Sequence, residues 1–141
     1  KPDIVSLAKG LGGGLPIGAT LFNEKTQNIF SKGDHGSTFG GNAAICAGAC
    51  NILSRIDGKL LSEVIRKGEI LRDILADFNP TGLGLMLGVK PAGSSREAAE
   101  DCIKNGVLCT TAKDKLRLLP PINIPEDLLI KAGKIIAQAC K

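Results

Sequence analysis

The 141-residue sequence has no tryptophan or tyrosine, and its four phenylalanines make up only 3% aromatic residues. Proteins that bind single-stranded nucleic acid without sequence preference stack bases on aromatic side chains, so such a surface is not expected. The formal net charge of +4 comes from lysines and arginines scattered among acids, with no basic run, which indicates a solvated, mildly basic surface. We therefore expect no nucleic-acid partner.

Long apolar runs and paired-cysteine motifs are also missing. No run is long enough to span a membrane and no secretory signal is visible, so we expect a cytoplasmic protein with no membrane partner. The cysteines include no Cys-x-x-Cys pair, so small buried side chains in a reducing compartment are favoured over a metal site. The five are Cys46, Cys50, Cys102, Cys109 and Cys140.

What stands out is a lysine between an apolar run and a cluster of glycines. Residues 4–8 predict a buried strand that ends on Lys9, and Gly10, Gly12, Gly13 and Gly14 follow. Lysine is almost never fully buried without a partner, and its amine forms Schiff bases with carbonyl cofactors. Glycines let the backbone turn tightly and approach a ligand closely. The pattern favours a covalent cofactor site, and an exposed lysine before a loose loop is the alternative.

Two commoner glycine-rich sites do not fit this stretch. A Walker-type phosphate loop places its lysine after the glycines, followed by Ser or Thr, whereas Lys9 precedes them. A dinucleotide fingerprint needs an acidic residue at a set spacing in a strand–helix–strand unit, and none follows here.

Four segments together resemble the class III pyridoxal-phosphate aminotransferases. Residues 8–18, AKGLGGGLPIG, are similar to the family's cofactor-lysine segment, and residues 33–42, GDHGSTFGGN, to its phosphate-contact loop. Residues 84–88, GLMLG, and 116–121, LRLLPP, follow in the family order. The resemblance implies an α/β fold, the C-terminal part of a fold-type I pyridoxal-phosphate transferase. Residues 1–43 would be the end of the large-domain sheet and residues 44–141 a linking helix with a small α+β domain.

The resemblance also implies roles for individual residues. Lys9 would hold pyridoxal 5'-phosphate and act as the catalytic base, and Thr38 would bind the cofactor phosphate of the neighbouring subunit in a homodimer. Ser37 would lie at the substrate. Arg117 would bind a substrate carboxylate or pair with a glutamate from an upstream part of the enzyme, which we expect to be missing here. The alternatives are helix capping for Ser37 and Thr38, with Asn42 the better cap, and an edge charge for Arg117.

The implied activity is transamination, with 2-oxoglutarate as the amine acceptor. Within the family the resemblance is strongest to members that act on N-acetylornithine in arginine biosynthesis. Ornithine, succinylornithine and 4-aminobutyrate remain alternative amino donors, and a non-catalytic binding module remains an alternative of another class. We expect these 141 residues alone to be inactive. Thr81 stands where the family usually has an arginine, which puts in doubt a contact between the small and large domains.

Periodicity and turn residues predict the secondary structure. Helices are expected over residues 43–56, 59–78, 96–105 and 126–141, and a short one over 24–31. Strands are expected over residues 4–8, 15–23, 83–89, 107–111 and 115–119. The apolar strands of residues 1–43 have no evident partners, so we expect this segment to be disordered, rearranged or paired with another copy through open edges.

Overall fold

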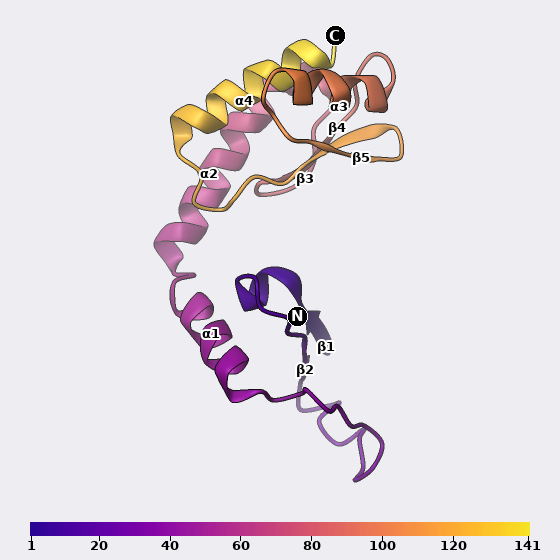
Figure 1. Ribbon diagram of the computed structural model, residues 1–141, viewed down its shortest axis with the longest axis vertical. Helices are drawn as coiled ribbons and strands as arrows, with labels where there is room; N and C mark the ends of the chain where they lie inside the picture. The colour runs from indigo at the N-terminus through magenta and orange to yellow at the C-terminus, as the bar shows by residue number, and fades with distance from the viewer. The chain divides into compact units, whose positions relative to one another are not determined.

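The computed structural model describes residues 1–141, which form two compact units, Lys1–Asp57 and Gly58–Lys141 (Figure 1). Both helices and strands are present, which confirms the predicted α/β class. None of the helices combines the length and the apolar character that crossing a lipid bilayer requires. The structure divides the chain after Asp57, one helix later than the functional division expected after residue 43. The functional division therefore stays a prediction.

The N-terminal unit contains one antiparallel hairpin. Strand β1 (Ile4–Leu7) pairs with β2 (Ala19–Phe22), with Ile4 opposite Phe22. The expectation that these strands have no partners is wrong, because they pair with each other. The expected burial of the first strand is also wrong: Ile4 is 47% and Leu7 41% exposed, since a two-stranded ribbon has no second layer to cover it.

A single helix, α1 (Ala43–Ser54), completes this unit. Asn42 caps it as predicted, because its side-chain oxygen accepts a hydrogen bond from the Ile45 N–H at 3.2 Å. The short helix expected over residues 24–31 is absent, and turns take its place. The Asn23 side chain accepts from the Lys25 N–H at 2.9 Å, which stabilises a turn where the helix was expected to begin.

The C-terminal unit is a four-stranded antiparallel sheet with helices on one face (Figure 1). The strand order is β3-β4-β6-β5. The strands are β3 (Thr81–Leu83), β4 (Met86–Val89), β5 (Thr110–Ala112) and β6 (Lys115–Leu118). The helices are α2 (Gly58–Ile74), α3 (Ser95–Lys104) and α4 (Glu126–Ala139), and the 3-10 helices are η1 (Lys9–Gly12), in the first unit, and η2 (Ala76–Phe78).

The core of this unit lies between the sheet and its helices. Side chains alternate along a strand, so one face of β4 and β6 turns toward the helices. Leu87 and Val89 of β4 and Leu116 and Leu118 of β6 are buried there. The core also includes Leu71, Leu75, Leu85, Ala98, Ala99, Cys102, Leu129, Ile136 and Cys140.

Two boundaries in this unit differ from the expectation. The single strand predicted over residues 83–89 is two strands, because Gly84 at φ 54° allows the chain to reverse between β3 and β4. Helix α3 begins at Ser95, one residue before the expected start at 96, and Ser94 caps it: the Ser94 hydroxyl accepts from the Glu97 N–H at 3.5 Å. Gly106 follows α3 with φ 82°, as a helix-terminating glycine should.

The cysteines divide by environment. Cys102 and Cys140 are buried in the core, as expected for small apolar side chains, whereas Cys50 is exposed. Burial raises the pKa of Cys109 to about 12 and that of Cys140 to about 11. Both thiols therefore stay protonated near neutral pH and are poor nucleophiles.

Gly68 of α2 lies against the backbone of the β3–β4 turn. A Cβ at this position would be 2.6 Å from the carbonyl oxygen of Gly84. Lys67 beside it is buried, and its Nζ donates to the Ile124 carbonyl at 2.7 Å. This stretch of α2 therefore contacts both the hairpin and the segment that leads into α4.

We predict that Gly68→Ala destabilises the C-terminal unit by roughly 1–3 kcal/mol, because the new methyl meets backbone that cannot rotate away. In an unobstructed helix the same change would stabilise by about 1 kcal/mol. The measurement is urea unfolding followed by helical circular dichroism. Gly93→Ala is the matched control, since nothing lies within 4 Å of a Cβ there. A Gly68→Ala midpoint at or above that of wild type would contradict the contact.

Candidate functional site

Lys9 lies at the end of β1, in the first position of η1, with its side chain exposed. Its backbone is left-handed, with φ 54°, directly after the extended Ala8. It is one of three non-glycine residues with positive φ in the chain. Such a backbone costs about 1–3 kcal/mol for a residue with a Cβ and little for glycine. A lysine at this position favours a role for its amine, because the backbone conformation alone would favour glycine.

The glycines after Lys9 hold this turn against α1. Gly13 has φ 58°, and a Cβ on it would be 2.8 Å from Cδ1 of Ile52 in α1. On the other side, Cδ1 of Leu15 would be 3.2 Å from a Cβ on Gly48. Bare backbone therefore lets the turn and the helix meet, and the position of the Lys9 turn depends on α1.

The loop of residues 33–42 presents two free hydroxyl groups. Ser37 and Thr38 are exposed and make no hydrogen bond within the chain, and Asn42, not either of them, caps α1. Ser37 lines a small pocket of about 200 Å³ together with residues 16–18 and the start of α1. Lys9 and Thr38 do not line this pocket.

The loop reaches α1 through glycines. Gly40 approaches Ser37 so closely that a Cβ would be 2.9 Å from that of Ser37, and Gly41 has φ 71°. The N-terminal end of a helix carries partial positive charge and unpaired N–H groups, which favour anions. Hydroxyls and glycine backbone before α1 therefore suit a phosphate group. His35, by contrast, packs near Phe30, with ring centroids 6.4 Å apart.

Arg117 belongs to the C-terminal unit and lies on the face of the sheet opposite the helices. It is exposed on β6, in register with Gly88 on one side and Thr110 on the other. Its Nε donates to the Thr110 hydroxyl at 3.1 Å. No carboxylate of the chain pairs with it, so its two terminal nitrogens are available to a carboxylate in the bidentate geometry that arginine favours.

Sequence reasoning missed Lys115, a second cation on this face. Its Nζ donates to the Thr81 hydroxyl at 2.8 Å. The signal was present in the alternation of residues 115–118, which places Lys115 and Arg117 on one face of β6 and two leucines on the other. The contact with Thr81 joins residues 34 positions apart, and only the sheet order brings them together.

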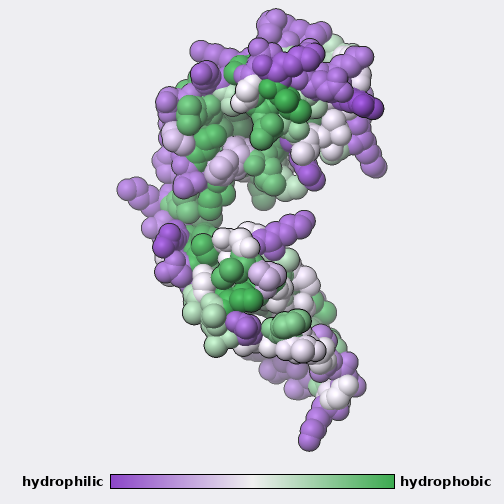
Figure 2. Space-filling view, viewed as in Figure 1, coloured by the Kyte–Doolittle hydropathy of each residue, from purple (hydrophilic) through white to green (hydrophobic).

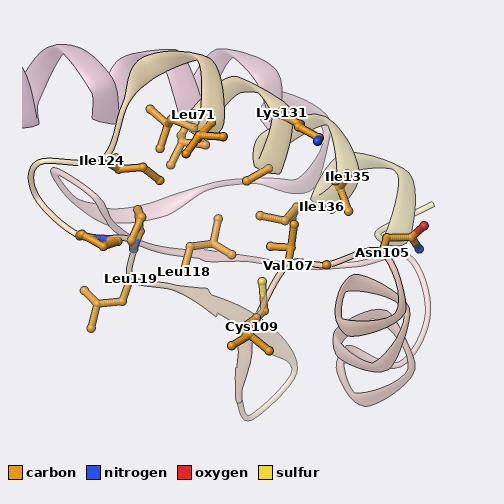
Figure 3. Close-up of a pocket in the computed structure, with 17 residues that line it drawn as sticks. Leu71, Asn105, Val107, Cys109, Leu118, Leu119, Ile124, Lys131, Ile135 and Ile136 are labelled. Carbon is orange, nitrogen blue, oxygen red and sulfur yellow. The ribbon is translucent and has the colours of Figure 1, made fainter.

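A groove in the C-terminal unit has no catalytic character. It has a volume of about 560 Å³ and lies between α4, the end of β6 and the segment after α3 (Figure 3). Leucines, isoleucines, valine and prolines make up most of its lining, and Lys131 and Asn105 lie at its edge. Leu108 of the lining is 87% exposed, as is Leu83 of β3 outside the groove, and Figure 2 shows hydrophobic residues reaching the surface of the unit.

Comparison with known proteins gives a consistent result over the whole chain. The family model described as aminotransferase class III matches residues 1–140. The acetylornithine aminotransferase of Haemophilus ducreyi is 46% identical, over 98% of this chain and 37% of the relative. That of Methanopyrus kandleri is 42% identical, over 99% and 38%. The chain thus spans little more than a third of the length of these curated relatives.

Solved structures agree with the sequence comparison. The acetylornithine aminotransferase from Elizabethkingia anophelis matches with a TM-score of 0.87 and 29% identity, over 99% of this chain and 39% of that one. The ornithine aminotransferase from Toxoplasma gondii matches with a TM-score of 0.88 and 29% identity, over 98% and 36%. This fold is therefore one that crystal structures of aminotransferases contain.

We predict that Gly13→Ala loosens the Lys9 turn, because alanine is disfavoured at φ 58° and its methyl would collide with Ile52. Amide hydrogen exchange at Gly13 and Leu15, whose N–H groups bond to Gly10 and Gly12, should accelerate about tenfold or more. Gly10→Ala is the control in the same turn, since its φ is not positive and nothing lies within 4 Å of a Cβ there. Equal exchange in the two variants would contradict this account of the turn.

Proposed function

The chain belongs to the class III aminotransferase family, and from that premise we propose that it carries the cofactor lysine of a pyridoxal 5'-phosphate-dependent enzyme. The reaction proposed is transfer of the terminal amine of N-acetylornithine to 2-oxoglutarate. The observation that carries the proposal is Lys9, an exposed amine on a left-handed residue in a glycine turn held against α1. Curated relatives named acetylornithine aminotransferase, up to 46% identical, support the choice of substrate.

The residues fit this cofactor by their chemistry. An aldehyde needs a primary amine for covalent attachment, which Lys9 offers, and a phosphate needs hydroxyl and N–H donors, which Thr38 and the glycines before α1 offer. Bound pyridoxal 5'-phosphate supplies an aldehyde that exchanges amines and a ring that accepts electron density. The other tasks fall to the side chains of the protein.

In this proposal the Nζ of Lys9 has two tasks. It would hold the cofactor covalently, and as a free amine it would move a proton at the substrate carbon as a general base. Ser37 contacts the substrate, and the guanidinium of Arg117 binds a substrate carboxylate through its two terminal nitrogens. The amine acceptor enters in a second half-reaction, so ping-pong kinetics are expected.

The proposal extends to the oligomeric state, the cellular location and the pathway. We propose a cytoplasmic homodimer in arginine biosynthesis, in which Thr38 of one subunit binds the cofactor phosphate of the other. The relatives extend well beyond the matched region, and we propose that activity needs the corresponding upstream part as well, so that the 141 residues alone are inactive. Ornithine is the second candidate donor, because ornithine aminotransferases match the fold as well as an acetylornithine enzyme does. The ratio of kcat/KM for the two donors decides between them.

We predict that Lys9→Ala in the complete enzyme abolishes transamination and also covalent capture of the cofactor. Borohydride reduction in the presence of pyridoxal 5'-phosphate should add a pyridoxyl group to the peptide that contains Lys9, read by mass spectrometry. Lys25→Ala is the control, since the side chain of Lys25 is exposed and makes only a surface ion pair with Asp3 at 3.4 Å. Turnover by the Lys9→Ala enzyme would remove Lys9 from this role.

The shared site gives a second prediction, tested by mixing subunits. Lys9→Ala and Thr38→Val dimers of the complete enzyme should each be nearly inactive at limiting cofactor. After dissociation and reassociation of equal amounts, activity should return to about a quarter of wild type, because half of the dimers are mixed and one of their two sites is intact. If Thr38 instead served the cofactor of its own subunit, mixing would restore nothing.

A further inference from the structure

Arg117 has a cross-strand side-chain partner on only one of the two strands that flank it. In the register of the sheet, Gly88 of β4 lies on one side of Arg117 and Thr110 of β5 on the other. Gly88 has no side chain with which to restrain the guanidinium. The Oγ1 of Thr110 accepts a hydrogen bond from the Nε of Arg117 at 3.1 Å. The direction of the guanidinium therefore depends on Thr110.

The hydroxyl of Thr110 has a defined direction of its own. Thr110 is the first residue of β5, and the pairing of β5 with β6 fixes its backbone opposite Arg117. Threonine is branched at Cβ, which restricts rotation about χ1. An arginine side chain that such an acceptor already holds loses less conformational entropy on binding a ligand than a free arginine side chain does.

This hydrogen bond uses one particular edge of the guanidinium. Arginine has five N–H donors, one on Nε and two on each terminal nitrogen. A carboxylate binds in two parallel hydrogen bonds either side-on, through Nε and one terminal nitrogen, or end-on, through both terminal nitrogens. Because Thr110 already accepts from Nε, the end-on edge is the one left for a ligand. The hydroxyl is neutral, so it leaves the positive charge intact, whereas a carboxylate at residue 110 would itself pair with the arginine.

From this geometry we propose that Thr110 is a positioning residue, whose hydroxyl turns the guanidinium of Arg117 so that both terminal nitrogens meet a substrate carboxylate end-on. The inference rests on the proposed function for the role of Arg117 and adds the residue that orients it. Thr110 touches no substrate and acts only through Arg117. A bidentate pair needs both nitrogens aligned with both oxygens, so loss of the Thr110 hydroxyl weakens carboxylate binding although the charge stays.

The first measurement tests the hydrogen bond itself and needs neither cofactor nor turnover. In the ¹⁵N-labelled 141-residue chain, the Nε–H signal of Arg117 is assigned as the one that Arg117→Lys lacks. Thr110→Val keeps the shape of the side chain without the acceptor, so this proton should exchange with water about fivefold faster, the size of one ordinary hydrogen bond. Thr110→Ser should retain the wild-type rate. Equal exchange in Thr110→Val and wild type would overturn the proposal.

The second measurement is kinetic and uses the complete enzyme. Thr110→Val should raise KM about fivefold for the substrate whose KM rises in Arg117→Ala, with kcat unchanged. In the Arg117→Ala background the same change should have no further effect, because Thr110 acts through the arginine. Thr110→Ser should restore the wild-type KM. Thr111→Val is the matched control, since Thr111 is the next residue of β5 and lies opposite Leu116, on the other face of the sheet.

The outcomes separate this inference from the proposed function. If Arg117→Ala raises no KM, the proposed role of Arg117 fails and the positioning role fails with it. If Arg117→Ala raises a KM and Thr110→Val does not, the positioning role alone is overturned. An effect of Thr110→Val that is equally large with and without Arg117 would also overturn it, because that pattern indicates a general loss of structure.

Discussion

The C-terminal unit depends on one constraint: only one face of its four-stranded sheet is buried. Leu87, Val89, Leu116 and Leu118 alternate with outward-facing residues, so their burial against the helices also fixes what the opposite face presents. A shift of register by one residue would bury Lys115 and Arg117 and expose the leucines. The same hydrophobic contacts that hold the unit together therefore also place Lys115 and Arg117 on the outer face of the sheet.

In both units, glycines occupy positions where the backbone lies in close contact with a side chain or with another backbone segment. Gly13 meets Ile52, Gly68 meets the carbonyl of Gly84, and Gly88 lets the stem of Lys115 pass. At each of these a methyl group would displace a neighbour. The position of the polar residues in the candidate site therefore depends on glycines that allow this close packing.

The sequence was sufficient where local chemistry decides the structure. Asn42 could be predicted as a helix cap, and Gly106 as a helix end, because each acts on its own neighbours. The β3–β4 hairpin was missed because its apolar run reads as one strand, and only the left-handed Gly84 breaks it. The burial of Ile4 and Leu7 was wrong because their periodicity carries no information about whether a second layer exists. The Lys115–Thr81 contact depends on strand order, which no local pattern encodes.

The contact between Gly13 and Ile52 has a mechanical consequence. Ile52 lies near the end of α1, and the turn it touches begins with the lysine. Because close-packed groups transmit displacement rather than absorb it, a tilt of α1 would swing the amine of Lys9 with it. Any contact that displaces the other end of α1 would therefore also change the direction of the Lys9 amine, without touching that amine.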